Sequence, residues 1–391
     1  MENILPKYKR PIAKIDDPTV NVDFWDEAVD AFDDKNYKQS ALAIINYINP
    51  NILKDVDAEQ DVIFTQMQGS AEVKVKITDS TFCIKTPFLR ITEQTNQVAL
   101  LRRVAEVNFT PLRLAQIHLK DNELFFDYEM PIELAQPNKV YDILREVCVY
   151  ADDFDDKFIE KYKADFYKTP KKIELTETEK EAVWQQISDI FEDYTNYSAF
   201  FKEKRWESYV WDLLAISFLK ISNMPYMHGK LRSDLIRNIS SLFNFDIDFN
   251  HRVDKGVNFM KELMARSKED ILKNAYHAEQ FLSLRWRSSE QIIKDWAQNR
   301  LETIQKYEKE ESNFNMSYYL QVGFLKLIYD YNLEQNYTDV INSVLEDVSG
   351  LEPSDAAPKM AEVFYQLLNG EINAPKPEKE KKKGFFSKLF N

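Results

Sequence analysis

Apolar and polar positions change their spacing several times in the first half of the chain. In residues 72–77 apolar and charged residues alternate with a period of two, which is typical of a half-buried strand. Residues 81–91 read as a second strand, and Pro87 within it indicates an edge position or a bulge. Residues 98–108 then switch to helical spacing. The residues that share one stripe of this predicted helix are Val98, Leu101, Val104, Ala105 and Asn108.

The pattern that follows predicts a hairpin and a closing helix. Residues 114–119 and 124–130 are strand-like and flank a turn-like tetrapeptide. After Pro137, a natural first-turn residue, the helical pattern runs on through an acidic stretch to residue 167. Before the first of these strands we expect helices at residues 23–32 and 37–48 and one more strand at 62–69. Together these elements predict an α+β fold with helices on one sheet face.

This order of elements resembles the type III secretion chaperone-like fold, as found in the YbjN family. Residues 100–108 resemble the central helix of that family, which ends in asparagine, and residues 114–130 resemble its hairpin, with Pro131 and Ile132 at the turn out of it. The resemblance covers residues 23–164, and it implies a dimer-prone, non-catalytic module that binds other polypeptides. The helical pair before it resembles a fragment of a tetratricopeptide repeat at Ala28, Phe32, Tyr37, Ala41 and Pro50. No second copy follows, so we expect the pair to pack on the sheet.

The second half of the chain predicts an irregular all-α helical domain over residues 171–370. A capping box at residues 176–179 opens its first helix, and a second one at 267–270 precedes a helical pattern that reaches residue 286. The most apolar stretch, residues 206–221, is expected at the centre of the core, although Glu207, Asp212 and Lys220 interrupt it. The predicted domains are therefore a polar arm (1–22), an α+β chaperone-like domain (23–170), the helical domain, and a flexible basic tail (371–391).

Composition and charge exclude several classes of function. The net charge is −14, and because the last sixteen residues carry six lysines and two glutamates, the rest of the chain is at −18. Such a chain repels phosphates, which argues against nucleic acid binding. The sequence has no apolar run of membrane-spanning length and no signal peptide, so we expect a cytoplasmic protein. Its cysteines, Cys83 and Cys148, are expected to be buried thiols.

No catalytic, cofactor-binding or metal-ligating residues are predicted. The histidines His118, His228, His251 and His277 lack metal-type partners at helical spacing, and His118 should face water. His228 lies in a loop beside Gly229, but no nucleophile or phosphate-loop motif accompanies it, which favours a structural turn. The acidic run at Asp152, Asp153, Asp155 and Asp156 is interpreted as a solvated face. The aromatic residues Trp206, Tyr209, Trp211, Phe218, Trp286 and Trp296 are interpreted as core, with a groove for a partner helix as the alternative.

The tail carries the clearest functional signal. A charged, proline-broken linker precedes residues 384–390, whose apolar residues fall together on a helix. Lysines near an anionic lipid surface contribute roughly 1 kcal/mol each, and apolar burial adds more, which suffices for reversible binding. Docking into a protein groove and no role at all are the alternatives. The predicted membrane- or partner-binding residues are Lys381, Lys382, Lys383, Phe385, Phe386, Lys388, Leu389 and Phe390.

The sequence therefore predicts a non-enzymatic cytoplasmic protein-binding protein, adaptor or chaperone-like. Its expected partners are other polypeptides of unknown identity, a second copy of itself, and an anionic membrane surface at the inner face of the membrane. The alternative hypothesis is an enzyme whose site lies in the helical domain. Under that hypothesis two of His228, His251 and His277 would share a cleft with carboxylates.

Overall fold

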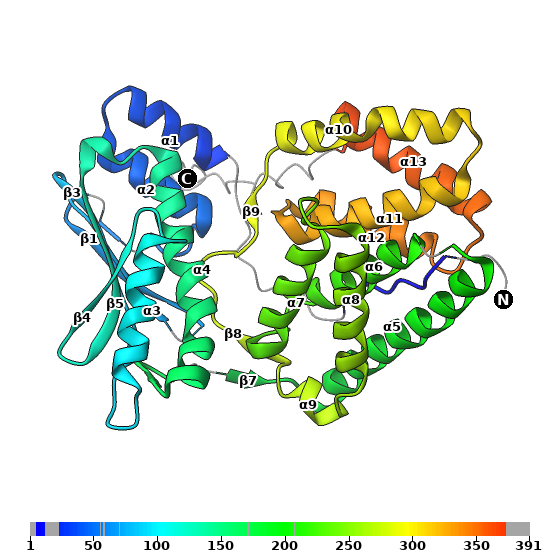
Figure 1. Ribbon diagram of the computed structural model, residues 1–391. Helices are drawn as coiled ribbons and strands as arrows, with labels where there is room; N and C mark the ends of the chain where they lie inside the picture. The colour runs from blue at the N-terminus through cyan, green and yellow to red at the C-terminus, as the bar shows by residue number, and fades with distance from the viewer. Residues whose placement is uncertain are drawn as a thin grey trace, which may run out of the picture.

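The structure, a computed structural model, describes residues 5–11, 23–54, 56–57, 59–69, 71–169, 172–206 and 208–372, without the side chains of residues 152 and 156. The chain is mixed α+β with a large helical part, and its buried apolar residues form two cores. Figure 1 shows the two regions side by side. We call residues 23–166 the α+β part, and residues 5–11 together with 172–372 the helical part.

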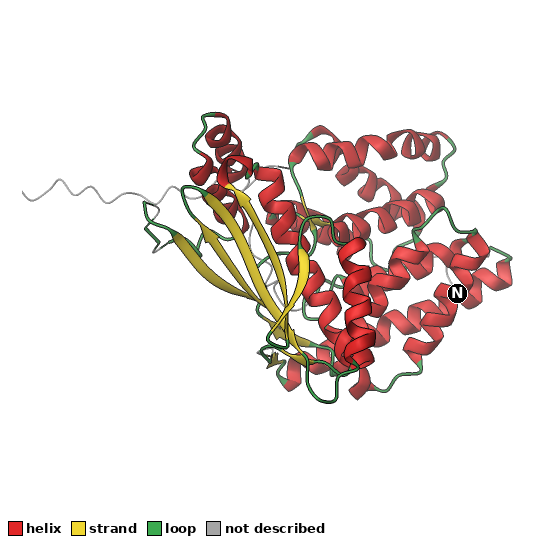
Figure 2. Ribbon diagram, turned by 60° about the vertical axis from the view of Figure 1, so that its left-hand side comes forward, coloured by secondary structure: helices red, strands yellow, loops and turns green. Residues whose placement is uncertain are grey.

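The α+β part is one antiparallel sheet with its helices on one face. Its strands lie in the order β1-β2-β3-β5-β4, with the short β6 beside β3. Along β2 buried and less buried side chains alternate, as the period of two predicts, and Figure 2 shows helices behind one face of the sheet. The elements are α1 (Asp23–Asp33), α2 (Tyr37–Ile48), β1 (Val62–Gln68), β2 (Ala71–Ile77), β3 (Thr81–Arg90), α3 (Gln97–Phe109), β4 (Gln116–Lys120), β5 (Glu123–Pro131), η1 (Ile132–Leu134), α4 (Pro137–Tyr162) and β6 (Asp165–Phe166).

Two details of this sheet refine the sequence predictions. β3 lies between β2 and β5, so the edge position suggested by Pro87 is wrong, while the register shifts between Pro87 and Leu89 as the alternative of a bulge predicts. The hairpin of β4 and β5 turns at Asp121 and Asn122, which both have positive φ. A tight hairpin turn requires this conformation, and aspartate and asparagine tolerate it.

The helical part contains nine helices among the described residues, and α6 packs against four of them, α5, α7, α8 and α11. All side chains of α6 from Leu213 to Ile221 are buried, which confirms the central place expected of this stretch. Thr176 and Glu179 form the predicted capping box at the start of α5. The helices are α5 (Glu177–Lys204), α6 (Tyr209–Ser222), α7 (Gly229–Leu242), α8 (Phe249–Met264), α9 (Lys268–Leu272), α10 (Glu290–Lys309), α11 (Asn313–Asp330), α12 (Gln335–Asp347) and α13 (Pro353–Asn369).

The prediction of an all-α second half is wrong in two places. Helix α9 ends at Leu272, and residues 273–288 form loops and short strands instead of continuing the helix to 286. These strands pair as β7 (Lys172–Glu174) with β8 (Tyr276–Ala278), and β9 (Trp286–Arg287) with β10 (Tyr331–Asn332). Tertiary packing explains why the helix does not continue, because Phe281 and Leu282, between β8 and β9, are buried in the core of the α+β part.

The N-terminal segment also departs from its interpretation as an arm. Residues 5–11 form neither helix nor strand, but they are packed into the helical part, where Leu5 is fully buried and Tyr8 nearly so. The side chains of the helical part supply most of the hydrogen bonds to this segment, and a short sequence pattern gives no sign of such distant partners. In Figure 1 the segment is the dark blue strip among the helices of the helical part.

Candidate functional site

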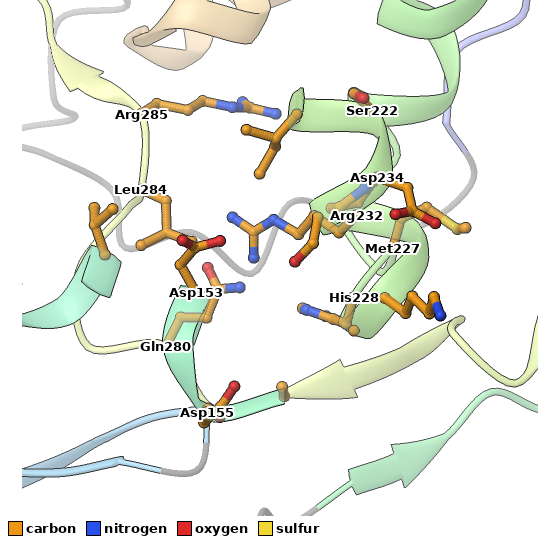
Figure 3. Close-up of a pocket in the computed structure, with 18 of the residues that line it drawn as sticks. Asp153, Asp155, Ser222, Met227, His228, Arg232, Asp234, Gln280, Leu284 and Arg285 are labelled. Carbon is orange, nitrogen blue, oxygen red and sulfur yellow. The ribbon is translucent and has the colours of Figure 1, made fainter. Parts of the chain in front are cut away.

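A cleft of about 740 Å³ lies between the two parts. One wall is the second half of α4, and the other is the loop before α7 together with the first turns of that helix. Between them the cleft is lined by Tyr276, Ala278, Gln280 and residues 284–286. Side chains of both signs line this cleft. Figure 3 shows Arg232 and Arg285 extending into it from opposite sides.

One ion pair crosses this cleft and a second lies within one of its walls. Lys230 Nζ at the start of α7 lies 2.9 Å from Glu160 Oε1 on α4, so this pair crosses between the two parts. Within α4, Lys157 pairs with Asp153 at 2.5 Å. Both ion pairs are well exposed, so each contributes little to stability, and together they favour a polar, solvated cleft over a dry one.

Arg145 anchors the middle of the cleft. Its Nη2 donates to the carbonyl of Leu284 at 2.9 Å, and its guanidinium lies 3.4 Å from the ring centroid of Trp286. Burial lowers the pKa of Arg145, and nearby tyrosines and Asp142 counter that effect in part. Trp286 remains 52% exposed, so it forms a surface platform and not a core residue as the sequence suggested.

Among the residues that line the cleft, His228 has the side chain type most often used in acid–base catalysis. It precedes α7, is buried, and stacks on Tyr276 with 4.7 Å between ring centroids. Burial, assisted by the positive charge of Arg232, lowers its pKa to about 3. The imidazole is therefore neutral near neutral pH, and it cannot donate a proton as a general acid there. The amide of His228 donates to the carbonyl of Asn274 at 2.8 Å, so its backbone and ring both contact the segment at residues 274–276.

The remaining histidines lie apart from the lining of the cleft. His118 is exposed on β4 beside Phe125, as predicted, and His251 is exposed on α8. His277 lies in β8 and is near enough to His228 to lower its pKa further, but it is not among the residues that line the cleft. In the described ranges no three His, Cys, Asp or Glu side chains are placed to hold a metal ion.

The interpretation of the acidic run as a solvated face is wrong in part. It lies inside α4, where Asp155 is only 5% exposed and Asp153 pairs with Lys157, so it is not simply a solvated face. A helix that packs on a sheet with one side and forms a cleft with the other places consecutive aspartates in different surroundings. The cysteines agree better with expectation: neither forms a disulfide, with Cys148 buried and Cys83 half-buried.

The aromatic residues of the helical part are mostly core, as predicted. Phe218 and Trp296 are buried, and Tyr209 packs on Phe201 and Phe314 with ring centroids 5.6 and 4.8 Å apart. Trp206 closes this cluster and keeps 39% of its surface exposed. None of the helices in the described ranges combines the length and the apolar character that crossing a bilayer requires.

A second candidate surface lies on α3 and was not expected. The residues of α3 that are buried in the core are Leu100, Val104 and Val107. Four other residues, Val98, Leu101, Ala105 and Phe109, follow one another at helical spacing on a neighbouring face, and we call them the outer stripe. Leu101, at the edge of this stripe, is partly buried against the core. Val98 is 76% and Phe109 88% exposed. The single stripe drawn from the sequence mixed these two faces and was wrong in that respect.

The predicted tail site, residues 381–390, lies outside the described residues. The chain matches no protein-family model, no curated protein and no solved structure.

Proposed function

We propose that this protein is a non-enzymatic protein-binding protein, adaptor or chaperone-like, whose α+β part has the type III secretion chaperone-like architecture of the YbjN family. The order of elements, a helical pair, three strands, a helix, a hairpin and a long helix, supports this architecture. The outer stripe of α3 carries the functional proposal. A solvent-exposed phenylalanine and valine on one helix face favour an interface.

The occupant that we propose for the outer stripe is a second copy of α3. In an antiparallel pair related by a two-fold axis, Val98 of one copy meets Phe109 of the other, and Leu101 meets Ala105. Large side chains thus lie opposite smaller ones, and the same patch serves both copies, as an isologous interface requires. The same pairing places the exposed Arg102 of one copy near the exposed Glu106 of the other.

Substitution of Phe109 tests this interface. Phe109→Asp should convert a dimer into a monomer at micromolar concentrations, because it places an unpaired carboxylate against the apolar side chain of Val98 in the other copy. Sedimentation equilibrium measures the change. Phe245→Asp is the matched control, since Phe245 is 73% exposed in the helical part and should leave the dimer intact. A monomeric wild type, or a dimeric Phe109→Asp variant, would contradict the proposal.

The tail supplies the membrane component of the proposed function. A single lysine-rich, apolar tail binds an anionic membrane only weakly and reversibly. A dimer presents two tails, so the second binding event becomes intramolecular and the overall affinity rises. The proposed adaptor thus binds its partners while it is held at the inner membrane face.

Deletion of residues 381–391 tests the recruitment. The full chain should co-sediment with vesicles that contain anionic lipid at physiological ionic strength, and the shortened chain should not. Neutral vesicles are the control for charge. If the shortened chain co-sediments as well as the full chain, the tail does not recruit the protein. The Phe109→Asp variant should bind vesicles more weakly than wild type if both tails act together.

A further inference from the structure

The helical part binds residues 5–11 in a manner that resembles peptide recognition. The backbone amide of Lys7 donates to Asp193 at 2.8 Å, and the carbonyl of Lys7 accepts from Lys220. The amide of Tyr8 donates to Ser349 Oγ at 2.8 Å. Side chains from distant helices therefore replace the backbone partners that a strand or helix would give this segment.

Main-chain contacts continue on both sides of these residues. The backbone carbonyl of Arg10 accepts from the side chain of Gln186 at 2.9 Å, and the backbone amide of Arg10 donates to Glu346 at 3.0 Å. The amide of Leu5 donates to the carbonyl of Leu351 at 2.8 Å. Contacts to the main chain do not depend on which side chains the segment carries, so they would hold any segment of the same backbone shape.

Three side chains define the register of the segment. Leu5 is fully buried, and Tyr8, three residues on, donates its hydroxyl to Asn342 at 2.8 Å. Two residues further, Arg10 forms an ion pair with Asp339 at 3.0 Å. We call the surface of the helical part that contacts residues 5–11 the groove. It holds an apolar residue, a tyrosine and an arginine at fixed spacing.

Charge complementarity extends along the groove. Within the seven residues, Lys7, Lys9 and Arg10 give the segment a charge of +3, in a chain whose net charge is −14. The groove carries Asp193, Asp339 and Glu346 close to the segment. Opposite charges of this kind accelerate encounter and favour a basic partner over an acidic one.

The two side chains that bind the backbone of Lys7 are both charged and buried. Lys220 and Asp193 are each less than 10% exposed, with 7% and 8% of their surfaces accessible. Burial lowers the pKa of Lys220 to about 8, although Asp193 and Asp189 oppose the change. Asp193 accepts from the backbone amide of Lys7, and Lys220 donates to its carbonyl. The bound segment thus covers two charges and supplies each with a hydrogen-bond partner.

We propose that this groove is a peptide-binding site for a partner polypeptide with an extended basic segment of the type apolar-Pro-x-Tyr-x-Arg, and that residues 5–11 are its intramolecular competitor. The partner displaces the chain's own segment and takes over its main-chain contacts. This inference deepens the proposed protein-binding function by naming a site and the chemistry of the partner. It does not depend on the outer stripe of α3.

A peptide with the sequence of residues 5–11, acetylated, amidated and fluorescently labelled, is the probe. The full chain with Leu5→Asp and Tyr8→Asp, which keep its own segment out of the groove, should bind the peptide roughly tenfold or more tightly than wild type, because wild type competes at a high effective concentration. A peptide with Tyr8→Ala should lose roughly tenfold or more in affinity. Binding should also weaken with salt. The Phe109→Asp variant should bind as its parent does, which separates this site from the dimer interface.

No binding by a folded variant of this kind would overturn the proposal, since the segment would then only seal the helical core. Hydrogen exchange of the wild-type chain decides the question if the variant fails to fold. In a displaceable segment the amides of Lys7 and Tyr8 exchange much faster than that of Leu219 in α6. Equal rates would mean that the segment leaves only on global unfolding, and the proposal would be wrong.

Discussion

Asp212 is an ionisable residue within the apolar stretch of α6. Asp212 lies in the first turn of this helix, partly accessible to water, and burial raises its pKa from the ordinary value of 3.8 to about 7. Burial of the phenol groups is the main cause that raises the pKa values of Tyr209, Tyr307 and Tyr318, and the negative charge of Asp212 raises them further. Asp212 is thus a charge that the folded state tolerates poorly.

The contribution of Asp212 to stability should depend on pH. Since the carboxyl pKa of Asp212 is raised by folding, its contribution to stability is present below pH 3.8 and is lost as the pH rises through about 7. Asp212→Asn should stabilise the protein by about 1–2 kcal/mol near pH 8 and by much less near pH 4. Urea unfolding at both pH values measures this. Asp246→Asn, at an exposed carboxylate, is the control for removing one negative charge. An equal effect of Asp212→Asn at both pH values would contradict the assignment.

At the scale of elements, the close approach of α8 to α6 depends on a glycine. A methyl group added at Gly256 would lie 2.9 Å from Cδ1 of Leu214, which is fully buried. Alanine favours a helix by about 1 kcal/mol over glycine, but overpacking costs about 1–3 kcal/mol. Gly256→Ala should therefore destabilise the protein by about 1 kcal/mol, measured by urea unfolding.

A double-mutant cycle separates overpacking from other effects of this substitution. Leu214→Ala alone should cost about 2–5 kcal/mol. Combined with Gly256→Ala, the loss should be smaller than the sum of the two single losses, because the new methyl group enters the space that Leu214 vacates. Strict additivity would show that the two side chains do not compete for the same space.

How well elements could be predicted depends on the distance over which their partners lie. The bounds of α2, the hairpin turn and the Thr176 cap follow from patterns within a few residues, and the sequence predicted them. Both faces of α3 are apolar, so spacing could not tell the buried stripe from the exposed one. Residues 5–11 and 276–288 were misjudged because their partners lie in parts of the chain far away in sequence. The tail site remains a prediction.

At the scale of the whole molecule, the helical part inserts a loop into the core of the α+β part. Gln68 at the end of β1 is fully buried, and its Oε1 accepts from the amides of Phe281 and Leu282, each at 3.1 Å. The amide of Gly69 donates to the carbonyl of Glu279 at 3.0 Å. The loop between β8 and β9 thus completes the core of the α+β part, although it belongs to the helical part in sequence.

This junction should couple the unfolding of the two parts. Phe281 is buried against Phe64, with ring centroids 6.0 Å apart, so Phe281→Ala should cost about 3–5 kcal/mol. Because the loss falls on the α+β part, calorimetry should show one transition in wild type and two in the variant, with the α+β part melting first. Phe245→Ala, at a phenylalanine that is 73% exposed, is the control and should keep one transition. A single transition in Phe281→Ala at a lower temperature would mean that the ion pairs and Arg145 contacts across the cleft are enough to couple the parts.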